Sequence, residues 1–204
     1  VERGEACADR VWSEVRCEAP WHSRAERTEA RQALARFLEY HVRADRELVD
    51  TEQSMKVEIE VPGADEQADH VLLRGFIDRL ERDAHGRVVP VDLKTVRKAP
   101  SEADVSDNGQ LGVYQRMVQA GGDEAGGAAL VQLRIPGGKG EPGPKVQTQE
   151  ALEARDPTWV DIRLGEAAAI VRHEDFPARP GGSCRYCPFE TACPVQVEGQ
   201  QVSP

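Results

Sequence analysis

A strict alternation of apolar and polar residues runs through S-M-K-V-E-I-E-V, residues 54–61. The apolar residues occupy every second position: Met55, Val57, Ile59 and Val61. Because successive side chains of a strand point to opposite faces, this pattern predicts a half-buried β-strand. Pro62 and Gly63 follow directly and predict the turn that ends the strand.

Three further segments have the composition of strands. Two of them, residues 70–82 and 87–95, flank the turn sequence D-A-H-G and predict a hairpin with an Asp inside each arm. The third covers residues 128–135, directly after a glycine-rich break.

Helical spacing of apolar residues marks residues 24–48, 108–120 and 156–172. In the first of these, the predicted apolar stripe consists of Leu34, Phe37, Leu38, His41 and Val42. The order helix, three strands, helix, strand, helix predicts an α/β fold in which helices flank a mixed central sheet.

The composition limits the possible functions. The 204 residues suffice for one domain with a small appendage, and no apolar run is long enough to cross a membrane. The first twenty residues carry charges throughout, so we expect no secretory signal and a cytoplasmic location. A net charge of −10 argues against coating of nucleic acid by bulk electrostatics, but a nuclease remains possible because its metal site is itself built from carboxylates.

The predicted hairpin carries the candidate chemistry. Asp78 in G-F-I-D-R and Asp92 in V-D-L-K-T interrupt apolar runs, where an unpaired buried carboxylate would cost several kcal/mol. Strand alternation places Asp92 and Lys94 on one face and directs Leu93 to the core. The hairpin can bring Asp78 beside Asp92.

Two converging carboxylates with an ammonium group beside them fit a divalent-metal hydrolase. The acids can hold Mg²⁺ or Mn²⁺ through oxygen ligands, and the lysine can orient a water or stabilise the charge of the transition state. The alternative is an ordinary Asp–Lys ion pair on the surface of the hairpin.

Three cysteines lie within ten residues near the end of the chain: Cys184, Cys187 and Cys193. Without a secretory signal, metal ligation is a better explanation of their C-x2-C-x5-C spacing than a disulfide framework. Zinc, an iron–sulfur cluster and free thiols all remain open, although three clustered cysteines plus one remote cysteine suit a 4Fe-4S cluster.

Taken together, these motifs resemble a known family. The segments V-W-S-E-V-R-C-E-A-P-W-H-S and G-F-I-D-R-L-E-R, with V-D-L-K-T and Q-L-G-V-Y, resemble RecB-like nucleases of the PD-(D/E)XK superfamily, in the iron–sulfur branch. The strongest resemblance is to the C-terminal nuclease domain of actinobacterial two-motor helicase–nucleases, which act in double-strand-break resection. It implies a restriction-endonuclease-like core at residues 24–175, a lead-in at 1–23 and an iron–sulfur segment at 176–204. Since the chain begins at Val1, we expect a fragment of a longer helicase–nuclease.

The resemblance also implies roles for particular residues. Asp78, Asp92 and the backbone carbonyl of Leu93 would be metal ligands, and Lys94 would be the catalytic lysine. On the following helix, Gln110 and Tyr114 would face the site. The family usually adds a His in a G-x-x-x-H setting; neither His22 nor His41 has that setting, so we expect this His upstream of Val1 and His41 in the core.

For the cluster, the resemblance implies that the three C-terminal sulfurs face one point. We expect the fourth ligand upstream of the chain, with Cys7 or Cys17 as the weaker candidates.

The expected substrate is single-stranded DNA delivered by a fused or partnered ATP-dependent helicase, during end resection and recombinational repair. Candidate phosphate contacts are Arg79, Arg97 and Lys98. The alternative is a non-catalytic DNA-binding or scaffold module that has a nuclease-like fold and a zinc or iron–sulfur knuckle.

Overall fold

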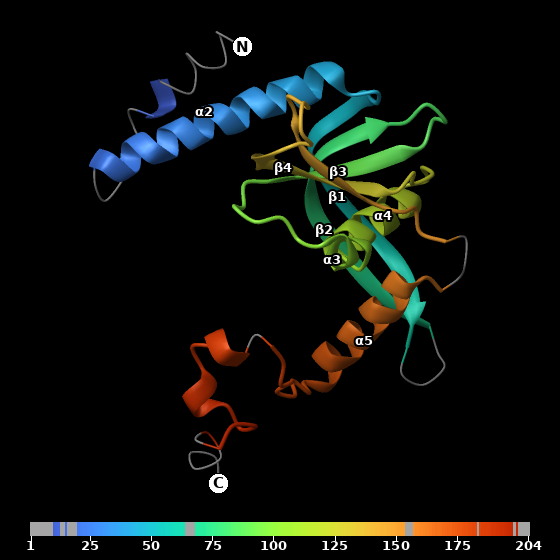
Figure 1. Cartoon of the computed structure of the whole chain (residues 1–204). Helices are drawn as coiled ribbons and strands as arrows, with labels where there is room; N and C mark the ends of the chain where they lie inside the picture. Colours follow the sequence, from blue (N-terminus) through green and yellow to red (C-terminus); the bar gives the residue numbers. More distant parts are fainter. Residues whose placement is uncertain are drawn as a thin grey trace.

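The structure of the chain is a computed structural model (Figure 1). It describes residues 10–12, 15, 20–63, 68–153, 157–182, 184–197 and 199, without the side chains of Pro20 and His22.

Five strands form one mixed sheet in the order β1-β2-β3-β4-β5. Their bounds are β1 Glu47–Pro62, β2 Ala68–Arg82, β3 Val88–Lys94, β4 Ala128–Pro136 and β5 Pro144–Gln149. Only β3 and β4 pair in parallel, and the other three pairs are antiparallel. The carboxyl ends of β3 and β4 therefore lie at the same edge of the sheet.

Helices cover both faces of this sheet (Figure 1). Their bounds are α2 Pro20–Arg43, α3 Glu102–Ser106, α4 Gly109–Ala120 and α5 Trp159–His173. Tyr40 of α2 packs against a buried cluster on one face, made of Val89, Val91, Ala129 and Val131. On the other face, Val105 of α3 and Leu111 of α4 pack against Ala128 and Leu130. The predicted α/β fold with a mixed sheet between helices is confirmed.

Close backbone contacts place α4 and α5. A Cβ atom added at Gly165 of α5 would lie 2.2 Å from the carbonyl oxygen of Pro62, so only glycine lets α5 cross the end of β1 this closely. A Cβ at Gly112 of α4 would come within 2.9 Å of side-chain atoms of both Trp159 and Val160. The first contact sets α5 against the end of β1, and the second sets the first turn of α4 against the start of α5.

The sequence pattern failed to predict two elements and misplaced the buried face of one helix. The short helix α3 and the edge strand β5 were not predicted. In α2, the predicted stripe is wrong at Val42, which is 80% exposed, and at His41, which is exposed and stacks on Phe37 instead of entering the core. The helix instead faces the sheet through Ala33, which is buried, and Tyr40.

The C-terminal segment extends beyond α5, apart from the sheet (Figure 1). It contains two short 3-10 turns, η1 Cys184–Tyr186 and η2 Glu190–Ala192. In the part of the chain that the structure describes, no helix is long and apolar enough to span a membrane.

Candidate active site

Strand β3 brings Asp92 and Lys94 to the face of the sheet that α4 covers. Val91 and Leu93 pack on the opposite face with Tyr40, as strand alternation requires. Asp92 is only 3% exposed, and its Oδ2 lies 2.7 Å from Lys94 Nζ. The lysine side chain keeps 32% of its surface exposed, so its ammonium group can reach a bound substrate.

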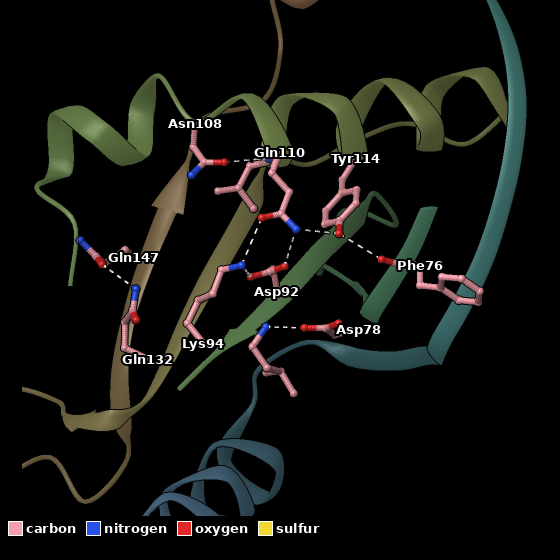
Figure 2. A network of polar contacts seen from close by, with 11 residues as sticks. Phe76, Asp78, Asp92, Lys94, Asn108, Gln110, Tyr114, Gln132 and Gln147 are labelled. Carbon is pink, nitrogen blue, oxygen red and sulfur yellow. Dashed lines mark hydrogen bonds and ion pairs between the residues drawn. The ribbon is translucent and has the colours of Figure 1, made fainter. Parts of the chain in front are cut away.

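Asp78 joins the site where β2 and β3 separate. The last paired residues of the two strands are Arg79 and Val91, and beyond them the backbone N–H of Leu93 donates to Asp78 Oδ2 at 2.7 Å. The Asp78 carboxylate thereby takes a backbone donor that the strand ladder no longer uses (Figure 2). Burial raises the pKa of Asp92, and the two acids lie close enough that the charge of Asp78 adds to this effect.

Helix α4 supplies the third side of the site. Asn108 caps its first turn by accepting a hydrogen bond from the N–H of Leu111, which sets Gln110 above the end of β3. Gln110 Nε2 donates to Asp92 Oδ1 at 2.9 Å, while its Oε1 accepts from Lys94 Nζ at 3.1 Å (Figure 2). One amide therefore holds both ends of the Asp92–Lys94 pair.

The orientation of that amide is fixed by Tyr114, one turn along the helix. The Tyr114 hydroxyl donates its single proton to the carbonyl of Phe76 at 3.0 Å, so it accepts from Gln110 Nε2 at 2.8 Å. The amide nitrogen must then face Asp92 and the amide oxygen must face Lys94. The predicted grouping of Asp78, Asp92, Lys94, Gln110 and Tyr114 is thus present in the geometry.

Burial dominates the electrostatics of Asp92. Removal from water raises the pKa of its carboxyl, and the nearby charge of Asp78 adds to this effect. Lys94 and Gln110 act in the opposite direction but do not cancel it. In the metal-free site, ionisation of Asp92 therefore costs more free energy than ionisation of an aspartate in water.

The amino-acid sequence matches the family described as the PD-(D/E)XK nuclease superfamily over residues 1–194. The chain belongs to this superfamily. None of the curated proteins compared with it matches. Among solved structures, one titled "Crystal structure of SSO0001" is similar, with 17% identity, coverage of 88% of this chain and 73% of that chain, and a TM-score of 0.47.

Members of the PD-(D/E)XK superfamily are typically metal-dependent nucleases, and two carboxylate oxygens here are suited to a metal ion. Asp92 Oδ2 is buried and, apart from the Lys94 ion pair, has no well-aligned hydrogen-bond donor among the described residues. Asp78 uses Oδ2 for the Leu93 N–H, which leaves Oδ1 without a hydrogen bond to any of the described residues. Such oxygens suit Mg²⁺ or Mn²⁺. Two acids alone do not complete a site, and the described residues contain no group of three or more His, Cys, Asp or Glu side chains placed to hold a metal.

The prediction that Arg79 of this PD-(D/E)XK chain contacts DNA is wrong. Its side chain is 3% exposed, lies over the Tyr40 ring and pairs with the fully buried Glu81 at 2.5 Å. The reason is that side-chain alternation in β2 slips near Asp78, since Ile77 and Leu80 enter the same core cluster. Arg97 and Lys98, in contrast, are exposed beyond the end of β3.

The three C-terminal cysteines do not converge on one point, contrary to expectation. Cys184 Sγ accepts the N–H of Gly181 at 3.2 Å, a contact within its own turn, and Cys187 is exposed. Cys7, Cys17 and the side chain of His22 lie outside the described residues.

Sequence reasoning missed a group of buried glutamines behind the site. Its members are Gln115, Gln132, Gln147 and Gln149. Gln149 Nε2 donates to the carbonyls of Val105 and Ser106, the last residues of α3, and to the carbonyl of Asn108, the N-cap of α4. Their only sequence signal is the alternation of Gln147 and Gln149 along β5, which resembles an exposed strand. These amides hold the loop from which α4 starts.

Proposed function

We propose that this chain is a Mg²⁺- or Mn²⁺-dependent deoxyribonuclease domain that hydrolyses phosphodiester bonds of single-stranded DNA. The observation that carries the proposal is the convergence of two acids and a lysine: Asp92 is 3% exposed, its Oδ2 lies 2.7 Å from Lys94 Nζ, and the Asp78 carboxylate lies beside it. A purely structural ion pair has no need for a second acid, because the charge of Asp78 adds to burial in opposing the ionised form of Asp92.

In this proposal, Asp78, Asp92 and the backbone carbonyl of Leu93 hold the metal. When bound, the metal supplies a water of lowered pKa and neutralises charge that develops on the scissile phosphate. Lys94, held by Asp92 and Gln110, presents its ammonium group to the phosphate or to the attacking water. Gln110 and Tyr114 are positioning residues, since they fix the direction from which Lys94 approaches.

The finer part of the proposal concerns the biological setting. We assign the chain to the RecB-like iron–sulfur branch, in which a fused or partnered ATP-dependent helicase delivers the single strand during double-strand-break resection. The support is the resemblance of the quoted segments together with the acidic net charge of −10. A tethered strand makes high intrinsic affinity unnecessary, because linkage raises its effective concentration at the site.

The same assignment gives Cys184, Cys187 and Cys193 to a 4Fe-4S cluster, with zinc as the alternative metal. Their spacing within ten residues supports this part of the proposal. Anaerobic purification of the longest available form of the protein tests it. A brown protein with visible absorbance supports iron–sulfur, and a colourless protein that contains zinc excludes it.

Lys94→Ala tests the catalytic proposal. We expect the variant to lose cleavage of a 5′-labelled single-stranded oligonucleotide in Mg²⁺ or Mn²⁺, while Mn²⁺ still binds. Retention of metal binding separates the lysine's role from that of the two acids. Cleavage at the wild-type rate would contradict the role of Lys94, and absence of cleavage by the wild-type protein would favour the non-catalytic module.

A further inference from the structure

A second charged hollow lies on the α2 side of the sheet edge that carries the candidate active site. Its volume is about 510 Å³, and its lining residues are Ala25, Glu26, Thr28, Glu29, Arg97 and Arg134. The two arginines come from different elements: Arg97 follows β3, and Arg134 belongs to β4.

One carboxylate currently joins the two arginines. Arg134 Nη2 donates to Glu26 Oε2 at 3.0 Å, and Arg97 Nη2 donates to Glu26 Oε1 at 2.5 Å. Each oxygen of the planar carboxylate thus receives a separate guanidinium group, as two oxygens of a phosphate could. The hydrogen bond from Arg134, together with both guanidinium charges, lowers the pKa of Glu26, so the group is an anion at neutral pH.

Arg134 has unused binding capacity. Its Nε is buried without a hydrogen-bond partner among the described residues, and the nearest carboxylate oxygen, Glu29 Oε2, is 3.6 Å away. A buried N–H without an acceptor is unfavourable, and a phosphate has an additional oxygen that could accept it.

The position relative to the active site follows from the strand register. Lys94 of β3 lies opposite Gln132 of β4. Arg134 stands two positions further along β4, which is about 7 Å at the usual rise of a strand. Arg97 lies three residues after Lys94, in the segment that follows β3. Arg134 lies in the last part of β4, so both arginines are on the carboxyl side of Lys94 along the parallel strands.

We propose that Arg97 and Arg134 form a phosphate-binding subsite for the DNA strand, and that Glu26 occupies this subsite in the DNA-free protein. Entry of a DNA phosphate displaces the Glu26 carboxylate from the two guanidinium groups. This inference rests on the proposed nuclease function but concerns a contact away from the metal ligands.

The proposal predicts that loss of either arginine and loss of Glu26 have opposite effects on DNA affinity, although all three residues belong to one ion-pair network. Arg134→Gln and Arg97→Gln each remove one phosphate contact, and Glu26→Gln removes the competing anion. We expect Glu26→Gln to bind single-stranded DNA roughly two- to fivefold more tightly, the range that corresponds to release of a partly exposed ion pair. If the ion pairs only held α2 against the sheet, the arginine variants and Glu26→Gln would not differ in the direction of their effect on DNA affinity.

Fluorescence anisotropy of a labelled single-stranded oligonucleotide, measured in EDTA over a range of salt concentrations, provides the test. Loss of one phosphate contact lowers the slope of log K against log salt by about 0.7 for single strands. We expect this decrease for Arg134→Gln and for Arg97→Gln. Since the Arg97 side chain is 73% exposed, its variant keeps the test valid if Arg134→Gln does not fold.

Glu39→Gln is the matched control, because Glu39 lies near the other end of α2 and pairs with Arg43. It removes the same charge from the same helix and should leave DNA affinity near that of the wild type. An unchanged salt slope in both arginine variants, or weaker DNA binding by folded Glu26→Gln, would overturn the subsite. If the wild type cleaves DNA and these outcomes occur, only the subsite is wrong; a wild type without cleavage contradicts the nuclease function itself.

Discussion

The candidate active site should lower the stability of the protein when no metal is bound. Asp92→Asn replaces the buried carboxylate by a neutral group of almost the same shape. The amide oxygen can still accept the hydrogen bond of Gln110 Nε2, which now reaches Asp92 Oδ1 at 2.9 Å. The amide nitrogen then takes the place of Oδ2, and the part-exposed Lys94 side chain can turn its ammonium group towards solvent. We therefore expect the variant to be more stable than the wild type at pH 7 in EDTA.

The magnitude follows from two opposing contributions. Burial and the charge of Asp78 oppose the ionised form of Asp92, at a desolvation cost of about 1–3 kcal/mol that the substitution removes. The substitution also removes the ion pair with Lys94, which is 32% exposed, so that loss is no more than about 1 kcal/mol. A net gain of about 1 kcal/mol corresponds to an increase in Tm of roughly 2–4 °C for a chain of this size.

The pH dependence has a definite sign. Burial raises the pKa of Asp92 above its value in the unfolded chain, so between the two values the native state binds more protons. The free energy of unfolding of the wild type therefore falls as pH rises through the native pKa of Asp92. The difference in free energy of unfolding in favour of Asp92→Asn should reach its full value above that pKa and should shrink as the pH is lowered.

Thermal unfolding of both proteins in EDTA at several pH values measures this effect. Asp83→Asn is a control of opposite sign: although burial works against it, hydrogen bonds from Arg87 and His85 lower the pKa of Asp83, so its replacement should destabilise the protein at pH 7. Added Mg²⁺ should stabilise only a protein that binds it and should reduce the difference between Asp92→Asn and wild type. A lower Tm for Asp92→Asn than for wild type at pH 7 in EDTA would refute the reasoning.

Three further outcomes test the surroundings of the site. Gln110→Leu should lower kcat by about 10- to 100-fold with little change in KM or Tm, because it removes a hydrogen bond to a charged group worth about 1.5–3 kcal/mol. Steady-state cleavage kinetics measure this effect, and Gln119→Leu on the same helix is the control. Gln149→Leu should lower the free energy of unfolding in urea by about 2–3 kcal/mol, since the carbonyls of Val105, Ser106 and Asn108 lose their shared donor; a stability equal to wild type would contradict this role. Gly165→Ala should cost about 1–3 kcal/mol because the new Cβ meets the Pro62 carbonyl, whereas Gly143→Ala, with open space around its Cβ, should leave Tm unchanged.

The grouping of the central residues could be predicted because it depends on local periodicity. Strand alternation alone puts Asp92 and Lys94 on one face, and the spacing of one helical turn puts Gln110 and Tyr114 side by side. Both relations survive in the structure because β3 and α4 are regular where these residues lie.

The features that could not be predicted depend on breaks in periodicity or on polar burial. Arg79 was expected at the surface, but the slip of alternation in β2 turns it inward toward Glu81. Strand β5 was missed because Gln147 and Gln149 occupy its inward positions, and buried amides look like exposed ones in a sequence. In α2, Tyr40 faces the sheet because its hydroxyl reaches buried Glu81, a partner 41 residues away that helical spacing does not reveal.

The central claim is that Asp78, Asp92 and Lys94 form the metal-dependent active site of a nuclease. Cleavage of a 5′-labelled single-stranded oligonucleotide by wild type and by Asp92→Asn, in the presence of Mn²⁺, tests it most directly. We expect cleavage by the wild type that stops on addition of EDTA, and at least a hundredfold slower cleavage by Asp92→Asn, although that variant is folded and more heat-stable in EDTA. Cleavage by Asp92→Asn at the wild-type rate would contradict the claim.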